Sequence, residues 1–229
     1  MDVRRIMARS APLKPEFGPT LPQLLAPRMH RLPLIVKRVA AVVVVILVVL
    51  IVVLALRLRD PTFSYPAPRP TGFSTTYSRS LKREPARPGV PLTLVQNSSV
   101  GLENFFQVKI IELPAYSGQI SGLLPIIASN MITRMQAADP TFTPYSRGRT
   151  RINKIPGYTF TFQELRGGRR VWGRIVLITH DIDKDREGLL ITMLADPTPL
   201  GPIATRPVTP DSVGTVGVLF EPYERLKFH

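Results

Sequence analysis

The chain has 229 residues, no cysteine, and 30 Lys and Arg against 16 Asp and Glu, which gives a formal net charge of +14. The absence of cysteine from these residues excludes disulfides, a cysteine nucleophile and thiolate metal sites. Most of the excess charge precedes residue 88: residues 1–87 hold 15 basic and 4 acidic residues (+11), whereas residues 88–229 hold 15 and 12 (+3). A nucleic-acid-binding domain would carry its positive charge on the folded part. The distribution therefore argues against nucleic acid and favours membrane lipid as the partner.

The most distinctive segment is an unbroken apolar run at residues 39–56, rich in valine. Eighteen helical residues extend about 27 Å, close to the ~30 Å hydrocarbon thickness of a bilayer. A buried core element and a cleaved signal peptide are the alternatives. The run is long for either, and no small-x-small cleavage site follows it. The sequence therefore predicts a transmembrane helix at residues 39–58 that acts as an uncleaved signal anchor.

Four basic residues lie within about 20 positions before the run and three lie within the same distance after it. This bias favours a cytoplasmic N-terminus and a C-terminal domain outside the cytoplasm, so that the protein spans the cell membrane once. Residues 1–38, rich in proline and basic side chains, are predicted to be a disordered tail near anionic lipid, with docking of a partner as the alternative. Residues 59–91, with seven prolines, are predicted to be an extended stalk.

A folded domain is predicted for residues 92–229. Its first elements are strands at Leu92–Gln96 and Phe105–Glu112, followed by a helix at Ile120–Ala138 in which apolar residues recur every three or four positions. Asp139-Pro140 is expected to end this helix, because proline cannot continue the hydrogen-bond ladder.

A hairpin is predicted around Gly167-Gly168, because two glycines suit a tight turn that requires positive φ. With Arg166 opposite Arg169, Phe162 faces Gly173, Phe160 faces Ile175, and Tyr158 faces Leu177. Tyr158, Phe160 and Phe162 then share one buried face. Further strands are expected at 188–194 and 213–220. One helix followed by strands with short connections predicts an α+β domain whose antiparallel sheet is covered on both faces.

Two stretches carry a family resemblance. Residues 152–162, Ile-Asn-Lys-Ile-Pro-Gly-Tyr-Thr-Phe-Thr-Phe, and then Gly-Gly-Arg-Arg-Val-Trp-Gly-Arg up to Arg174, resemble the PsbP-like superfamily, and within it the LpqN-type actinobacterial envelope proteins. Lys154 stands where that pattern has a glycine. Over roughly residues 90–225 the resemblance implies an α/β/α sandwich used for binding or assembly. It implies no catalytic residue.

The residues that could carry chemistry form no complete site in the sequence. Asp181, Asp183, Asp185 and Glu187 alternate like the start of a calcium loop, but Arg186 and Thr192 occupy the positions that need glycine and glutamate. A solvated loop is therefore expected, with no metal and no cofactor. His180 is interpreted as a solvated or capping residue.

The candidate binding surface is basic. Six arginines in and near the predicted hairpin are its proposed members: Arg147, Arg149, Arg151, Arg169, Arg170 and Arg174. Such a patch suits an acidic protein, a lipid headgroup or a cell-wall polymer, and a solvated sheet rim is the alternative. The sequence thus predicts a membrane-anchored, non-enzymatic binding or assembly domain, an accessory subunit of a membrane complex. A tethered carrier of a lipid or other amphiphile is the second hypothesis.

Overall fold

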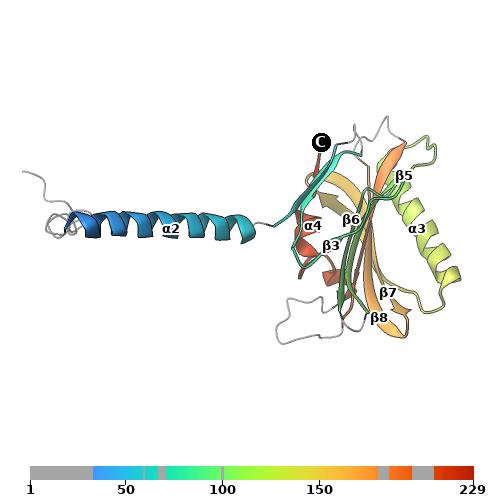
Figure 1. Cartoon of the computed structure of the whole chain (residues 1–229). Helices are drawn as coiled ribbons and strands as arrows, with labels where there is room; N and C mark the ends of the chain where they lie inside the picture. Colours follow the sequence, from blue (N-terminus) through green and yellow to red (C-terminus); the bar gives the residue numbers. More distant parts are fainter. Residues whose placement is uncertain (1–32, 59, 67–70, 99–100, 180–185, 198–208) are drawn as a thin grey trace, which may run out of the picture. The chain divides into compact units, whose positions relative to one another are not determined.

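The computed structural model describes residues 33–58, 60–66, 71–98, 101–179, 186–197 and 209–229 (Figure 1). The chain divides into two compact units, Met1–Arg59 and Asp60–His229. The predicted tail therefore lies outside the described residues, except for its last positions. Those positions are helical, because helix α2 spans Leu34–Leu58 and so begins before the predicted residue 39.

Helix α2 is apolar on every side. From Val39 to Leu54 the described large side chains are aliphatic and about half exposed, with Leu50 at 62%. Such a helix differs from the surface helix of a globular protein, which keeps a polar face. Counting only the residues that are described, none of the helices is both long and apolar enough to cross a membrane.

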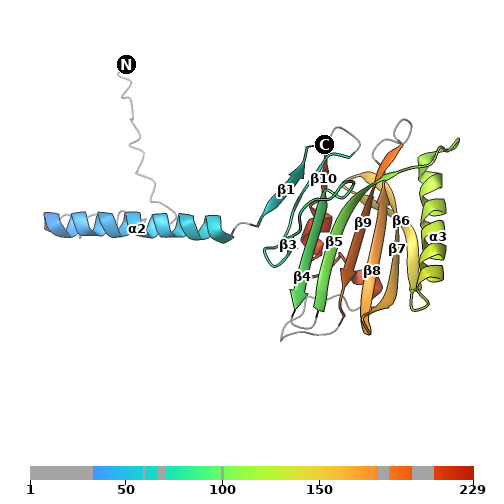
Figure 2. The ribbon, with the colours of Figure 1, turned by 45° about the vertical axis from the view of Figure 1, so that its right-hand side comes forward.

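The second unit is built on a seven-stranded antiparallel sheet with the order β3-β4-β5-β9-β8-β7-β6 (Figure 2). Its strands are β3 Lys82–Arg83, β4 Leu92–Ser98, β5 Gly101–Glu112, β6 Thr143–Ile152, β7 Ile155–Arg166, β8 Arg169–Ile178 and β9 Glu187–Ala195. The strands predicted near residues 92, 105 and 188 are thereby confirmed. The domain is α+β with antiparallel sheets and few helices, as the sequence indicated.

The hairpin between β7 and β8 has the predicted register. Gly167 and Gly168 adopt φ values of 58° and 78°, the left-handed values that a primed two-residue turn requires. Phe162 is opposite Gly173 and Phe160 is opposite Ile175. Both phenylalanines are buried, and a Cβ on Gly173 would lie 2.1 Å from the Phe162 ring, so the glycine makes room for that ring.

Helix α3 covers one face of this sheet. It spans Ile120–Ala138, the predicted bounds, and Asp139 caps it through its backbone N–H on the Met135 carbonyl at 2.9 Å. Its buried residues Leu124, Ala128 and Ile132 pack with Phe160 and Phe162 in one core cluster. Figure 2 shows α3 beside the end of the sheet formed by β6 and β7. The residues of the predicted period, Ile127, Met131 and Met135, are half-buried against the same cluster, so the period found this face in part.

The other face is covered by chain that the sequence assigned to a stalk, and that assignment is wrong. Three strands, β1 Thr62–Tyr65, β2 Phe73–Thr76 and β10 Lys227–Phe228, form a second antiparallel sheet. Phe63 and Phe73 from it belong to the core cluster that fills this face. The Arg83 guanidinium lies 4.4 Å from the Phe63 ring centroid. The prolines flank β1 and β2, so the segment looked like an extended linker although Phe63 and Phe73 alternate with less buried residues.

The strand predicted at 213–220 is also wrong. The structure has a 3₁₀ turn, η1 at Pro210–Ser212, and a short helix, α4 at Phe220–Glu224. Gly214 and Gly217, with φ of 79° and 74°, bend the chain between them and prevent an extended run. Both faces of the main sheet are covered, as predicted. The second layer is this C-terminal segment together with the small sheet, whereas the resemblance implied helices on both sides.

The position of residues 60–91 in the core predicts where the domain begins. A chain starting at Leu92 loses the buried side chains Phe63, Phe73, Tyr77 and Leu81. Deleting one large buried side chain costs about 3 to 5 kcal/mol, and a whole domain is stable by only about 5 to 15 kcal/mol. We expect residues 60–229 to unfold cooperatively in urea and residues 92–229 to show no cooperative transition by near-ultraviolet circular dichroism. Equal midpoints for the two chains would contradict the role of residues 60–91.

Candidate functional site

Three of the six candidate arginines lie together on the edge strand β6. Arg147, Arg149 and Arg151 pair with Phe160, Tyr158 and Pro156 of β7. Side chains directly opposite each other in a sheet share a face, so the three arginines lie on the face that α3 covers. All three are exposed. β6 is the last strand of the sheet and protrudes beside the helix.

A turn that needs no glycine sets this register. Asn153 and Lys154 join β6 to β7 with φ of 44° and 73°, both in the left-handed region. Asparagine tolerates that region, and its side-chain amide donates to the Leu226 carbonyl. The C-terminal segment is thereby joined to the turn between β6 and β7.

Two hollows lie between α3 and β6. One, of about 440 Å³, is lined by helix residues including Ile132 and Thr133 and by strand residues including Tyr145 and Arg147. The other, of about 380 Å³, is lined by Leu124 of the helix and by residues of β6 and β7 that include Arg149, Arg151 and Pro156. Each is lined by polar and apolar residues together and includes at least one arginine. We call the two hollows and the three arginines the β6 groove.

The position of α3 over this groove is fixed at the end of the helix. The Thr141 hydroxyl and backbone N–H both donate to Asp139 Oδ1 at 2.7 Å, which holds the pKa of Asp139 below its ordinary value. The same hydroxyl accepts the Leu165 N–H at 3.0 Å. One short network therefore joins the helix end to β7.

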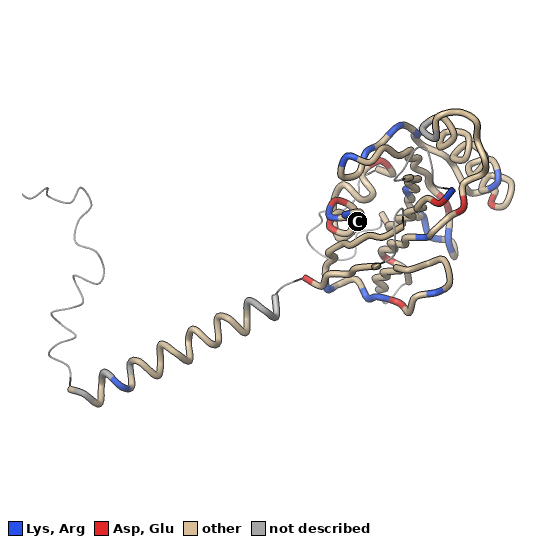
Figure 3. Tube along the Cα trace, turned by 90° about the horizontal axis from the view of Figure 1, so that it is seen from above, with Lys and Arg blue, Asp and Glu red and all other residues tan. Residues whose placement is uncertain are grey.

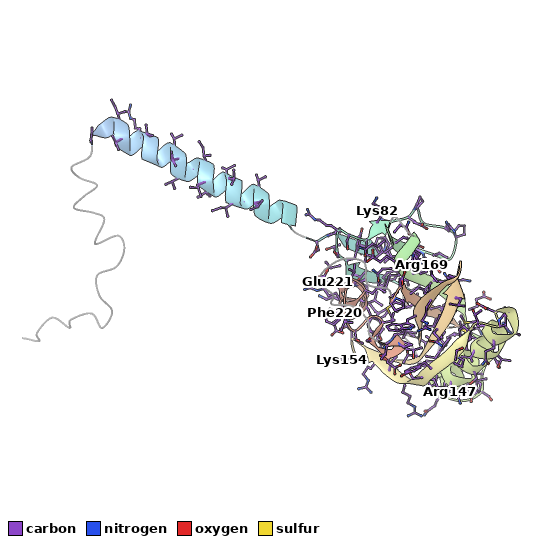
Figure 4. The ribbon with its side chains drawn as sticks, turned by 90° about the horizontal axis from the view of Figure 1, so that it is seen from below. Lys82, Arg147, Lys154, Arg169, Phe220 and Glu221 are labelled. Carbon is purple, nitrogen blue, oxygen red and sulfur yellow. The ribbon has the colours of Figure 1, made fainter. Side chains whose placement is uncertain are left out.

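The other three candidate arginines do not join the β6 groove, so the predicted single patch of six is wrong. Arg170 and Arg174 alternate with the buried residues Val171 and Ile175, and their side chains therefore lie on the opposite face. Arg169 is only partly exposed, because it pairs with the buried carboxylate of Asp196. Figure 4 shows Arg147 and Arg169 well apart, and Figure 3 shows basic positions spread around the second unit.

Arg174 belongs to a polar cluster that the sequence did not predict. Asp211 Oδ1 accepts hydrogen bonds from Thr161 Oγ1 at 2.7 Å and from Ser146 Oγ, while Arg174 donates to the Asp211 carbonyl. The Arg174 guanidinium lies 5.9 Å from the centroid of the Tyr223 ring. Asp211 is 50 positions after Thr161 and 65 positions after Ser146, so no local sequence pattern could reveal its hydrogen bonds to them. The cluster fixes η1 to the sheet.

The remaining sequence candidates give little chemistry. His180 and the aspartates at 181, 183 and 185 lie outside the described residues, and the described Glu187 is a strand residue opposite Glu112. Among the described residues, no group of three His, Cys, Asp or Glu could hold a metal ion. His229, at the end of the chain, hydrogen-bonds Ser74 Oγ at 2.9 Å.

Comparisons with known proteins give a fold-level likeness at low identity. No family model and no curated protein sequence matches this chain. The solution structure of PsbP from Synechocystis (CyanoP) is 12% identical with a TM-score of 0.39 and covers 60% of this chain and 81% of that chain. The Ran-binding protein Mog1p of Saccharomyces cerevisiae is 8% identical with a TM-score of 0.40, covering 61% and 79%. PA94 of Pseudomonas aeruginosa, of unknown function, is 12% identical with a TM-score of 0.35, covering 59% and 83%. At these values the likeness transfers no functional residue.

The neighbouring residues Arg169 and Arg170 are predicted to differ in their effect on stability. Arg169→Ala removes the ion-pair partner of an Asp196 side chain that is 1% exposed, and breaking a buried pair in this way costs about 3 to 5 kcal/mol. Arg170→Ala changes an exposed side chain and should stay within about 0.5 kcal/mol. Urea unfolding of the two variants measures the difference. Equal stabilities would mean that the Arg169–Asp196 pair contributes nothing.

Proposed function

We propose that this chain is a single-pass membrane protein whose folded unit is a non-catalytic binding or assembly domain. In this proposal α2 is the anchor in the cell membrane, the folded unit lies outside the cytoplasm, and the protein is an accessory subunit of a bacterial envelope complex. The β6 groove is the observation that carries the binding function. It offers three exposed arginines on one face of an edge strand, beside two hollows of mixed polar and apolar lining.

The whole apolar run at residues 39–56 supports the anchor, including positions 40, 55 and 56, whose side chains lie outside the description. The helix that contains it has 25 residues, which at 1.5 Å each extend about 37 Å. Its described aliphatic side chains are exposed all around the helix. Exposed apolar surface of this extent requires a partner, and lipid is the partner that surrounds a helix.

The arrangement of the polar groups supports binding more than catalysis. Catalysis of acyl or proton transfer needs a base within hydrogen-bond reach of a nucleophile in a site that substrate can enter. The Ser146 and Thr161 hydroxyls reach the Asp211 carboxylate and so hold η1 to the sheet, although Ser146 also lines the larger hollow. In the groove itself the charged groups are arginines, which bind carboxylates and phosphates but do not exchange protons at neutral pH.

A second candidate function is the binding of a lipid or other small amphiphile. The two hollows, of about 380 and 440 Å³, are of the size that small ligands occupy, and each has apolar residues and an arginine in its lining, which suits a ligand with an anionic head. In this candidate the anchor keeps the carrier at the membrane that supplies its ligand.

The anchor predicts that the chain resists extraction from membranes. Replacing Val45 and Leu50 by arginine places two charges in the centre of the helix, at roughly 2.5 to 3.5 kcal/mol each. In bacterial cells we expect the unchanged chain, and a Val45→Leu, Leu50→Val control, to remain in the membrane after carbonate washing and to lose the folded unit to protease in spheroplasts. The arginine variant should be released. Release of all three chains would contradict the anchor.

The binding function predicts that reversing the charge of the β6 groove releases a partner. Arg147, Arg149 and Arg151 are changed together to glutamate, and the control changes the exposed Lys109, Arg134 and Arg170 in the same way. Both variants alter the net charge equally. After purification of the full chain in mild detergent, mass spectrometry should find a stoichiometric protein with the unchanged and control chains and a reduced amount with the groove variant. A copurifying lipid instead of a protein would favour the carrier, and no difference between the variants would contradict both.

A further inference from the structure

Strand β6 has an open edge. It spans ten residues, and in the described part of the chain only β7 pairs with it. Its exposed positions include Tyr145 at 59%. An unpaired strand of this length is a template for another extended chain unless its side chains prevent pairing.

The two turns of the meander determine which backbone groups of β6 face that edge. Ile152 and Ile155 flank a two-residue turn and so form the hydrogen-bonded type of antiparallel pair, after which the pair types alternate along the ladder. The non-hydrogen-bonded pairs are then those of Arg151, Arg149 and Arg147. The backbone N–H and C=O groups of these three residues point away from β7. The second turn leads to the same assignment. Arg166 and Arg169 form a hydrogen-bonded pair, and the alternation from there makes Phe160 and Ile175 a hydrogen-bonded pair as well. The backbone groups of Phe160 therefore point toward β8 and not toward Arg147.

The same three residues therefore present two kinds of group to an incoming strand. Their backbone N–H and C=O groups line the open edge, and their side chains lie on the α3 face beside the hollows. Residues of an added strand that sit opposite them would direct their side chains to that face as well. Every second residue of the added strand would then lie next to an arginine.

The charge of this edge selects its occupant. A second copy of the chain would place β6 against β6 with three arginines on the same face of each strand, and like charges opposite each other destabilise pairing. An amphiphile would meet the arginines but leave the backbone groups unpaired. An extended segment with acidic residues at alternate positions satisfies both the edge and the side chains.

We propose that β6 binds an extended acidic segment of a partner protein as an additional strand, with alternate carboxylates on Arg147, Arg149 and Arg151. This inference rests on the proposed binding function and specifies its partner class. The arginines serve two ends in this arrangement, because they repel other copies of the chain and attract the acidic strand.

The test uses the full chain in neutral detergent and two labelled peptides of equal composition and charge. One alternates threonine and glutamate over eight residues, and the other has four threonines followed by four glutamates. We expect fluorescence anisotropy at low salt to give about two- to fivefold tighter binding of the alternating peptide, because it can place a carboxylate beside each of the three arginines, whereas the block peptide can place only two on that face. Equal affinity would overturn the proposal, since charge alone would then explain binding.

A pair of variants at one residue isolates the backbone contribution. Arg149→Ala and Arg149→Pro remove the same charge, but proline also removes the N–H that faces the open edge. Because that N–H makes no bond to β7, both variants should unfold at similar temperatures. We expect the proline variant to bind the alternating peptide at least about fivefold more weakly than the alanine variant, by the loss of a hydrogen bond. Equal weakening in the two variants would exclude strand addition.

The peptide supplies an independent test if the proline variant does not fold. Methylating alternate backbone nitrogens of the peptide blocks one of its two hydrogen-bonding edges, and methylating the other set blocks the opposite edge. One set should abolish binding and the other should leave it within about twofold. If both sets bind equally while the charge-reversed groove variant still loses its copurified partner, the binding function stands and the added strand is wrong. If neither the methylated peptides lose binding nor the groove variant loses its partner, the binding function itself is contradicted.

Discussion

The register of the meander from β6 to β9 is the constraint on which the rest of the domain depends. Side chains alternate between the two faces of a strand, so a slip of one residue would move every aromatic core residue to the opposite face. Two short turns prevent this slip, one at Asn153-Lys154 and one at Gly167-Gly168, all four residues with positive φ. The first holds Arg149 opposite Tyr158, and the second holds Phe160 opposite Ile175. Burial of Phe160 under α3 and exposure of Arg147 beside α3 are therefore consequences of the same two turns.

The alternation that orders the core also divides the arginines. Arg169 and Arg170 are adjacent in the sequence, yet one pairs with the buried Asp196 and the other is exposed on the opposite side. Proximity in sequence made the six arginines look like one patch, although Arg174 lies on the face of β8 opposite to that of Ile175. The register separates Arg170 and Arg174 from Arg147, because Arg147 shares the face of Phe160 and Ile175. The ion pair of Arg169 does not follow from the sequence, since Asp196 is 27 positions away.

Local signals account for the elements that the sequence predicted. The period of α3, the proline that follows Asp139 and the two glycines of the β7–β8 turn each act within a few residues, and each gave the correct element. The errors concern elements whose stability comes from distant partners. β2 pairs with β1 and with the C-terminal β10, and Thr75 donates to the Pro222 carbonyl at 2.8 Å, across 147 positions. A proline-rich segment of this kind appears extended and featureless until its partner strand and its core are known.

Edge strands must be protected, and the manner of protection at β6 limits what can bind there. β3, at the other end of the sheet, has only two residues and offers almost no edge. β6 is five times as long, so side chains must provide the protection that length provides for β3. Charges prevent pairing only with strands that do not carry the complementary charge. Protection by Arg147, Arg149 and Arg151 is therefore selective. It disfavours a second β6, which carries the same charges, and under the proposed strand addition it leaves the edge open to an extended segment with acidic residues at the same two-residue period.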